Sequence, residues 1–270
     1  MRIMHFFVAC LFFCTGNSYS QPVFKLLSEQ PVDANRMVVD ELGNVYLMNT
    51  TGIERRNAVG NGIFRTSEMQ WGQFNPIDVT DPLRPFVHFP SSGKVVFFDN
   101  TLSVQGSPID LFELGYDNVE LMCGSRGDGF WLWDGRNAEL TRVNRSFAAM
   151  QASGNLSILL KTEFHPLAMM ERGSFLFVLN DDYQLHVFDM FGAWKKSLHL
   201  TAESTWEAES GKLYVFRKDG LMQIIDTKMW LTQEVSLPIS GGMFSYHNGS
   251  LYSLMEKNFR VYVAAEKGRN

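Results

Sequence analysis

The stretch GKLYVFRKDGLMQIIDTK, at residues 211–228, decides the fold of this chain. It opens with a glycine and continues through the apolar run 213–216. It then turns at residues 218–220, returns through the apolar run 221–225 and stops at Asp226. Two short apolar runs around a glycine-containing turn are typical of a β-hairpin. The stretch therefore predicts two antiparallel strands of one sheet.

The pattern of a turn followed by an aromatic strand recurs along the whole chain. Its six copies begin at Gly43, Arg84, Gly129, Gly173, Gly211 and Gly249. Successive copies are 41, 45, 44, 38 and 38 residues apart. A period of about forty residues with four short strands per unit indicates a β-propeller blade. We therefore predict an all-β fold, a six-bladed β-propeller with four-stranded antiparallel blades.

A polar turn residue supports the same register. It lies 15 or 16 positions after the start of a copy and ends a third apolar strand. Asp and Asn fit this place because their side chains bond to nearby backbone in tight turns. The four residues are Asp99, Asn144, Asp189 and Asp226. Inner strands are expected upstream of each copy, at residues 37–39, 77–79, 119–123, 167–170, 206–208 and 243–246.

The last unit has no outer strand of its own. The chain ends in a polar tail after the apolar run 259–263, whereas a further apolar run, VFKLL, stands at residues 23–27. Pairing of this N-terminal strand (about residues 22–29) with the last blade would close the ring and remove an exposed sheet edge. No stretch shows sustained helical periodicity, although residues 69–74 and 146–151 could each form a turn or two.

The composition is that of a folded protein, with 45% hydrophobic and 20% charged residues. No linker divides the chain, so residues 21–270 are expected to form a single β-propeller domain. The formal net charge is -5, and the longest basic clusters are the pairs at residues 55–56 and 195–196. Nucleic acid is not expected as a partner, because it requires a basic patch.

Residues 1–20 have the features of a signal peptide. Arg2 precedes an apolar stretch, and Ser18 and Ser20 are small residues at the positions that a signal peptidase reads. We expect cleavage after Ser20, export, and no transmembrane segment in the mature chain, because the apolar stretch is too short to span a bilayer. Two alternatives are an uncleaved interfacial anchor and a lipoprotein, since VAC at residues 8–10 loosely resembles a bacterial lipobox.

The cysteines favour a bacterial envelope. Cys10 and Cys14 lie in the expected signal peptide, so the mature chain keeps only Cys123 and has no internal disulfide. An exported protein of this size without disulfides fits a bacterial envelope better than a eukaryotic secretory route. Cys123 sits in an apolar run, which indicates a buried inert thiol rather than a nucleophile.

These units, such as GFWLW at residues 129–133 and GKLYVF at residues 211–216, resemble six-bladed β-propellers of the NHL, TolB and YVTN-like group. The resemblance extends to uncharacterised exported bacterial propellers and covers nearly all of residues 22–265. It implies the fold and little about function. Lactonase-like enzymes that resemble this group hold calcium with several Asp, Glu and Asn at the starts of the inner strands. The corresponding places here are Asn35, Asn75, Asn118, His165, Ser204 or Thr205, and Gly241.

No catalytic residue, metal site or cofactor is predicted. Amides and one histidine without clustered carboxylates suit a hard cation poorly, and the asparagines are expected to cap turns. The histidines are scattered and no pair has ligand spacing. No G-x-S-x-G elbow occurs, and the pair at residues 181–182 is typical of a solvated turn. The chain is therefore predicted not to be an enzyme.

One face of the propeller is expected to carry the partner site. It is formed by the loops before the inner strands and by the turns between second and third strands, including residues 71–76, 113–118, 162–166, 202–205, 49–52, 134–137, 180–183, 217–220 and 256–258. Aromatic and arginine side chains there favour protein or glycan contact. The candidate partner-binding residues are Trp71, Phe74, His165, Tyr183 and Arg217. The alternative for Trp71 and Phe74 is packing beneath their own loop.

The leading hypothesis is a non-enzymatic, exported scaffold that binds envelope proteins. It would act in the periplasm or at the outer membrane of a bacterium and support an assembly or secretion complex. The alternative is a propeller that binds a carbohydrate or small ligand in a central funnel lined by Trp71, Trp206 or Tyr246 with inward polar groups. A metal-dependent hydrolase or lyase is the third hypothesis.

Overall fold

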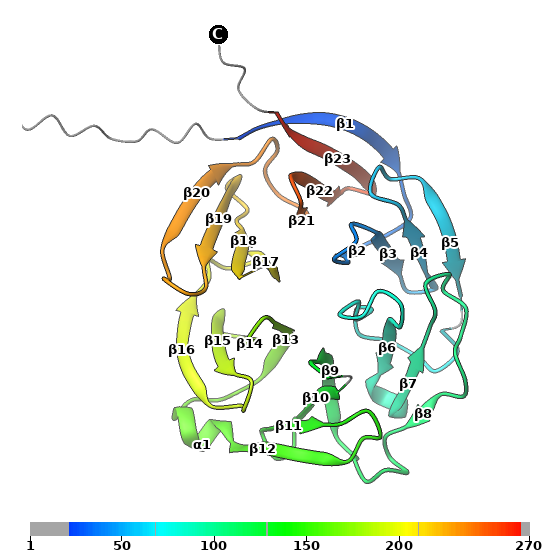
Figure 1. Ribbon diagram of the computed structural model, residues 1–270, viewed down its shortest axis with the longest axis vertical. Helices are drawn as coiled ribbons and strands as arrows, with labels where there is room; N and C mark the ends of the chain where they lie inside the picture. The colour runs from blue at the N-terminus through cyan, green and yellow to red at the C-terminus, as the bar shows by residue number, and fades with distance from the viewer. Residues whose placement is uncertain (1–21, 68, 128, 210, 266–270) are drawn as a thin grey trace, which may run out of the picture.

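The protein is a ring of six antiparallel sheets around a central axis (Figure 1). The structure is a computed structural model and describes residues 22–265 apart from 68, 128 and 210. Five sheets have four strands, and the sheet of the second blade has three. The predicted six-bladed β-propeller is confirmed.

Each blade runs from an inner strand at the axis to an outer strand at the rim. The strands of blade 1 are β2 (Arg36–Val39), β3 (Val45–Asn49), β4 (Gly52–Arg56) and β5 (Gly62–Thr66), and those of blade 2 are β6 (Phe86–Phe89), β7 (Lys94–Phe97) and β8 (Ile109–Asp110). Blade 3 contains β9 (Val119–Ser125), β10 (Gly129–Asp134), β11 (Glu139–Val143) and β12 (Ala149–Asn155). Blade 4 contains β13 (Pro166–Arg172), β14 (Phe175–Asn180), β15 (Gln184–Asp189) and β16 (Trp194–His199). Blade 5 contains β17 (Thr205–Glu209), β18 (Lys212–Phe216), β19 (Leu221–Asp226) and β20 (Thr232–Ser236). Blade 6 contains β21 (Met243–His247), β22 (Ser250–Met255), β23 (Asn258–Ala265) and β1 (Val23–Pro31).

The N-terminal strand closes the ring, as predicted. β1 pairs antiparallel with β23, from Val23 opposite Ala265 to Pro31 opposite Asn258, and the two strands lie side by side in Figure 1. A register shift between Leu26 and Ser28 bends the pairing. The outermost edge of blade 6 is thus covered by a strand from the other end of the chain.

Blade 2 departs from the repeat at its inner strand. Residues 77–79 form only one bridge, between Asp78 and Phe86, instead of a strand. The connection that follows contains Pro82 and Pro85, which cannot donate backbone hydrogen bonds to a ladder. The two prolines therefore account for the shortened pairing.

The predicted turn residues hold their turns in place. The Asp189 carboxylate accepts hydrogen bonds from the backbone N–H groups of Phe191 and Ala193 at 2.9 and 3.0 Å. Asp99, Asn144 and Asp226 make equivalent bonds to the backbone two to four residues further on. These four residues fix the link from the third strand to the fourth in blades 2 to 5.

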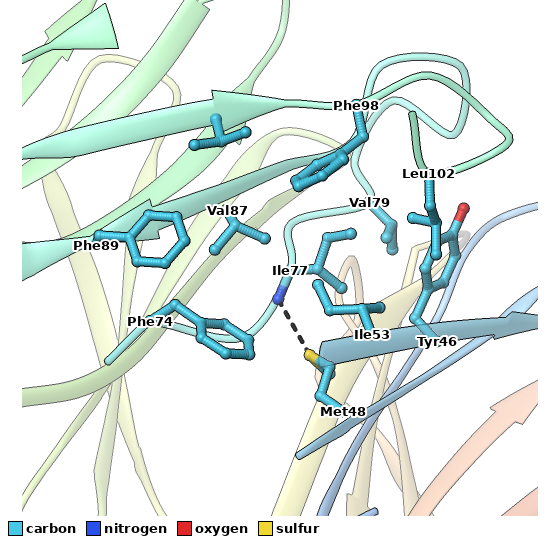
Figure 2. Packing of buried hydrophobic residues seen from close by; sticks show 11 residues of the cluster. Tyr46, Met48, Ile53, Phe74, Ile77, Val79, Val87, Phe89, Phe98 and Leu102 are labelled. Carbon is cyan, nitrogen blue, oxygen red and sulfur yellow. Dashed lines mark hydrogen bonds between the residues drawn. The ribbon is translucent and has the colours of Figure 1, made fainter. Parts of the chain in front are cut away.

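The core is divided into clusters that lie between neighbouring blades. Figure 2 shows one of them, in which Tyr46, Met48 and Ile53 of blade 1 face Phe89 and Phe98 of blade 2. The backbone N–H of Ile77 approaches the Met48 sulfur at 3.4 Å. Alternating strand residues face the preceding and the following blade, so each sheet contributes to two clusters.

The helical content was not predicted correctly. The structure has α1 (Leu156–Leu160), between blades 3 and 4, and the 3-10 helix η1 (Pro90–Ser92). Residues 69–74 contain only turns and bends, and β12 begins inside the segment 146–151. The five residues of α1 are too few to show helical periodicity in the sequence.

Candidate functional site

The central axis contains a cavity of about 370 Å³, a volume typical of small-molecule sites. It is lined by inner strands of the blades, which all run in the same direction along the axis. We call the side where these strands begin the start face, and the side where they end the end face. The start face carries α1 and the turn at residues 181–183, and the end face carries the turns at residues 40–44 and 190–193.

The two halves of the cavity differ in chemistry. Towards the start face the wall is mainly apolar and includes Leu167, Met169, Met243 and the ring of Trp206. Towards the end face the wall is rich in carboxylates. They belong to Asp40, Glu41, Asp78, Glu207 and Glu209. Asp40, Glu41 and Glu209 stand at or just after the ends of inner strands.

Buried carboxylates clamp neighbouring blades together near the end face. Glu171 of blade 4 accepts hydrogen bonds from blade 3, from Ser125 Oγ and Trp131 Nε1 at 2.6 Å and from the Arg126 N–H at 2.9 Å. Buried charges are costly unless hydrogen-bonded, so these three donors explain how Glu171 is accommodated. Glu171 is a structural clamp.

Glu207 makes the equivalent clamp between blades 5 and 6. Its carboxylate accepts from Ser245 Oγ at 2.6 Å and from the Tyr246 N–H at 2.5 Å. Burial raises the pKa of Glu207 to about 7 in spite of these bonds. Asp78 completes the set by accepting from the Gly124 N–H at 2.9 Å, which joins blade 2 to blade 3.

These clamps were not predicted from the sequence. The available signal was a carboxylate inside an otherwise apolar inner strand, as in MMER at residues 169–172 and TWEAE at residues 205–209. Charged residues are rarely buried without partners, so such a position indicates a specific acceptor role. The donors, however, lie some forty residues away and are placed only by the fold.

A close contact between a histidine and a carboxylate joins blades 5 and 6 beside the cavity. His247 Nδ1 lies 2.5 Å from Glu209 Oε1, and the other ring nitrogen lies 2.9 Å from Asn248 Nδ2. No group of three or more His, Cys, Asp or Glu side chains with metal-binding geometry occurs in the described part of the chain.

The remaining titratable core groups serve packing. Burial lowers the pKa of His88 to about 4 and also lowers that of His186, so both rings are neutral at pH 7. Cys123 is fully buried, and burial raises the pKa of its thiol, as expected for an inert cysteine. Asn75, in the loop before blade 2, donates to the Glu120 carbonyl in β9 of blade 3 at 2.9 Å.

The structure places Trp71 and Phe74 under their own loop. Phe74 is only 6% exposed and packs 5.9 Å from the Phe89 ring, with the Arg36 guanidinium 4.4 Å above it. Trp71 packs against the same Phe89 at 5.5 Å and does not line the central cavity. Trp206 and Tyr246 do line it.

The other three candidate residues lie in loops of the start face. His165 is exposed, and its backbone N–H donates to Asn180 Oδ1 at 2.5 Å. Tyr183 is half-buried at the end of the turn that follows β14. Arg217 forms ion pairs with Asp219 and, at 3.4 Å, with Glu234. Contact of the five residues with a partner stays a prediction.

The most exposed apolar side chains of the start face lie on α1, where sequence analysis placed no element. Ile158 is 77% exposed and Leu159 is 57% exposed, while Leu156 of the same helix is completely buried. The signal in the sequence was LSILL at residues 156–160, an apolar run between two blades that no strand of the repeat requires.

Comparison with known proteins identifies the fold and no family. Neither a protein-family model nor a curated protein matches the sequence. Among solved structures, virginiamycin B lyase from Staphylococcus aureus is 10% identical, with a TM-score of 0.58 over 90% of this chain and 100% of that chain. BBS1N, solved in complex with ARL6DN, is 9% identical, with a TM-score of 0.52 over 92% and 99% of the two chains. The Neurospora crassa Pan2 WD40 domain is 12% identical, with a TM-score of 0.53 over 87% and 76%.

These identities show a shared propeller architecture and no shared activity. The similar structures include a lyase and a protein solved with a partner, so the fold by itself assigns no reaction. Within residues 22–265 as described, no helix is long and apolar enough to cross a membrane.

Proposed function

We propose that this chain is a non-enzymatic scaffold that binds a protein partner in the bacterial cell envelope. It is exported by the signal at residues 1–20, cleaved after Ser20, and acts in the periplasm or at the outer membrane within an assembly or secretion complex. Residues 1–20 lie outside those that the structure describes, and the support for export is their sequence. The observation that carries the binding role is the exposed apolar pair Ile158 and Leu159 on α1.

The helix α1 holds this pair rigidly outward. Asn155 caps the helix by accepting from the Ile158 N–H at 2.9 Å, and Lys161 ends it in a left-handed conformation. Leu156 anchors the helix in the cluster between blades 3 and 4. Asn155 and Leu156 fix the N-terminal end, and Leu160 packs against the same cluster at the C-terminal end, so Ile158 and Leu159 cannot turn inward without unfolding the helix.

The surroundings of α1 favour a protein over other macromolecules. Exposed carboxylates of Glu163, Asp181 and Asp182 lie in loops of the start face. Exposed cations are Lys161, which ends the helix, and Arg136, in the turn whose carbonyls accept from Asn155 and Leu156. An apolar centre inside a polar rim is typical of protein interfaces. The matching partner surface has an apolar recess with a polar border. Exposed His165 lies in the loop between α1 and β13.

Site-specific photo-crosslinking tests this proposal. A photoreactive phenylalanine analogue is placed at Ile158 and, as a matched control, at Phe191, which is 67% exposed on the end face. In cells that express the full chain, we expect one reproducible cross-linked protein from position 158 and none from position 191. The double variant Ile158→Asp with Leu159→Asp is expected to abolish recovery of that protein, while Phe191→Asp leaves it intact. Absence of a reproducible cross-link at 158, or equal cross-links at both positions, contradicts the proposal.

A further inference from the structure

The central cavity is separate from α1 and its chemistry fits a ligand of its own. We propose that the cavity binds a small organic ammonium ion with an apolar body. The cation would lie towards the end face and the apolar body towards the start face. This site goes beyond the proposed scaffold function and does not depend on it.

The charge of the wall selects a cation. Glu41, Asp78, Glu207 and Glu209 line the cavity, whereas the Asp40 carboxylate is occupied by Leu42, Asn44 and Tyr46. The basic side chains in the same wall are Arg172 and His247, and His247 contacts Glu209. Asp78 and Glu207 each have lone pairs beyond those used between blades, because a carboxylate offers about four acceptor sites. Low-dielectric walls concentrate the field of such a ring inside the channel.

The opposite half suits the apolar part of the same ligand. The ring of Trp206 and the side chains of Leu167, Met169 and Met243 form this part of the wall. An aromatic ring packs well against an aryl body, and methionine adapts its shape to different ligands. Apolar surface beside carboxylates therefore matches an aryl or alkyl ammonium.

A charge series of three small probes tests the proposal by isothermal titration calorimetry on the purified chain. Phenethylammonium is compared with 3-phenylpropionate and 2-phenylethanol, which have a similar apolar body and a negative or no charge. We expect a Kd below about 1 mM for the cation and binding at least about tenfold weaker for the other two.

Matched variants locate the site. Trp206→Leu is expected to weaken phenethylammonium binding about tenfold by removing the ring, and Trp194→Leu, on the outer strand β16, to leave it unchanged. Glu209→Gln should weaken it about fivefold, with folding checked by the melting temperature. The Ile158→Asp with Leu159→Asp variant should bind the probe normally, which separates this proposal from the scaffold proposal. Equal binding of cation and anion, no binding of any probe, or an unchanged Kd in Trp206→Leu would overturn the assignment.

Discussion

Arg172 of blade 4 donates a hydrogen bond from Nη1 to Thr80 Oγ1 of blade 2 at 2.8 Å, passing over the end of blade 3. The contact is possible because blade 3 has Gly124 at this place. A Cβ on Gly124 would lie 2.8 Å from Thr80 Cβ and 3.1 Å from Asp78 Oδ1. A missing side chain in one blade thus allows its two neighbours to bond directly, on the end-face side of the cavity.

Thr80→Val should weaken this link. The substitution keeps the shape of the side chain and removes the acceptor of a part-buried charged donor, so we expect a loss of about 1 to 3 kcal/mol in the free energy of unfolding. Urea unfolding measures it. Thr232→Val, at an exposed position of β20, is the control and should change stability by less than about 0.5 kcal/mol. Equal effects of the two substitutions would show that the link between blades 4 and 2 adds nothing.

Removing the N-terminal strand should destabilise the whole ring. Deletion of residues 22–31 leaves the edge of β23 unpaired and removes the Glu29 partner of Arg260, whose Nη2 lies 2.7 Å from Glu29 Oε1. We expect a lower melting temperature and association of the exposed edges, measured by calorimetry and light scattering.

A milder test keeps the strand and reverses its ion pair. Glu29→Arg should destabilise the protein, and adding Arg260→Glu should restore most of the loss, with a coupling energy of about 0.5 to 1 kcal/mol. An unchanged melting temperature in the deletion would contradict the role of β1 in closing the ring.

Glu171→Gln should be among the most destabilising conservative changes in the chain. An amide cannot accept hydrogen bonds at both ends, so at least one of Ser125 Oγ, Trp131 Nε1 and the Arg126 N–H loses its acceptor. We expect a loss of about 2 to 4 kcal/mol by urea unfolding. Glu163→Gln, at an exposed position, is the control and should be nearly neutral.

Glu207 should make stability depend on pH. Its pKa is about 7 in the folded protein and near the ordinary value of 4.5 in the unfolded chain. Between these values the unfolded chain has already released the proton that the folded protein keeps, so the contribution of Glu207 is fully present below about pH 4.5 and is lost as the pH rises to about 7. Relative to Glu207→Gln, the wild-type protein should gain up to about 3 kcal/mol on going from pH 7.5 to pH 4.5.

The comparison with Glu207→Gln is needed because His88 acts in the opposite direction. Its pKa of about 4 in the folded protein means that stability is lost as the pH falls below the ordinary value of 6.5. Both proteins contain His88, so its contribution cancels in the difference between their urea unfolding curves. A difference that does not vary with pH would mean that Glu207 titrates normally in the fold.

The repeat was predictable because its signals are local. Asp99, Asn144 and Asp189 bond to backbone only two to four residues away, so their role can be read from the nearby sequence. The closing strand was predictable because the last blade had no outer strand of its own, and the apolar run at residues 23–27 could supply one. The clamps were not, since Glu171 meets donors 40 to 46 residues distant.

The apolar surface on α1 and the cavity could not be derived from the sequence for related reasons. LSILL at residues 156–160 can be buried or exposed, and only the position of Asn155 and Leu156 in the fold decides which side chains face solvent. The cavity is a property of six inner strands together. Trp206 and Tyr246 reach its wall only once blades 5 and 6 are in place.

The pairing of β1 with β23 also sets the order in which the blades can form during synthesis. The first strand of the ring cannot find its partner until residues 258–265 have been made, so the newly synthesised chain carries an unmatched strand until blade 6 follows the other five. Blades 1 to 5 can form earlier, because their strands are neighbours in the chain, but the circle is completed only when β23 has been made. A truncated chain would therefore be left with two open edges.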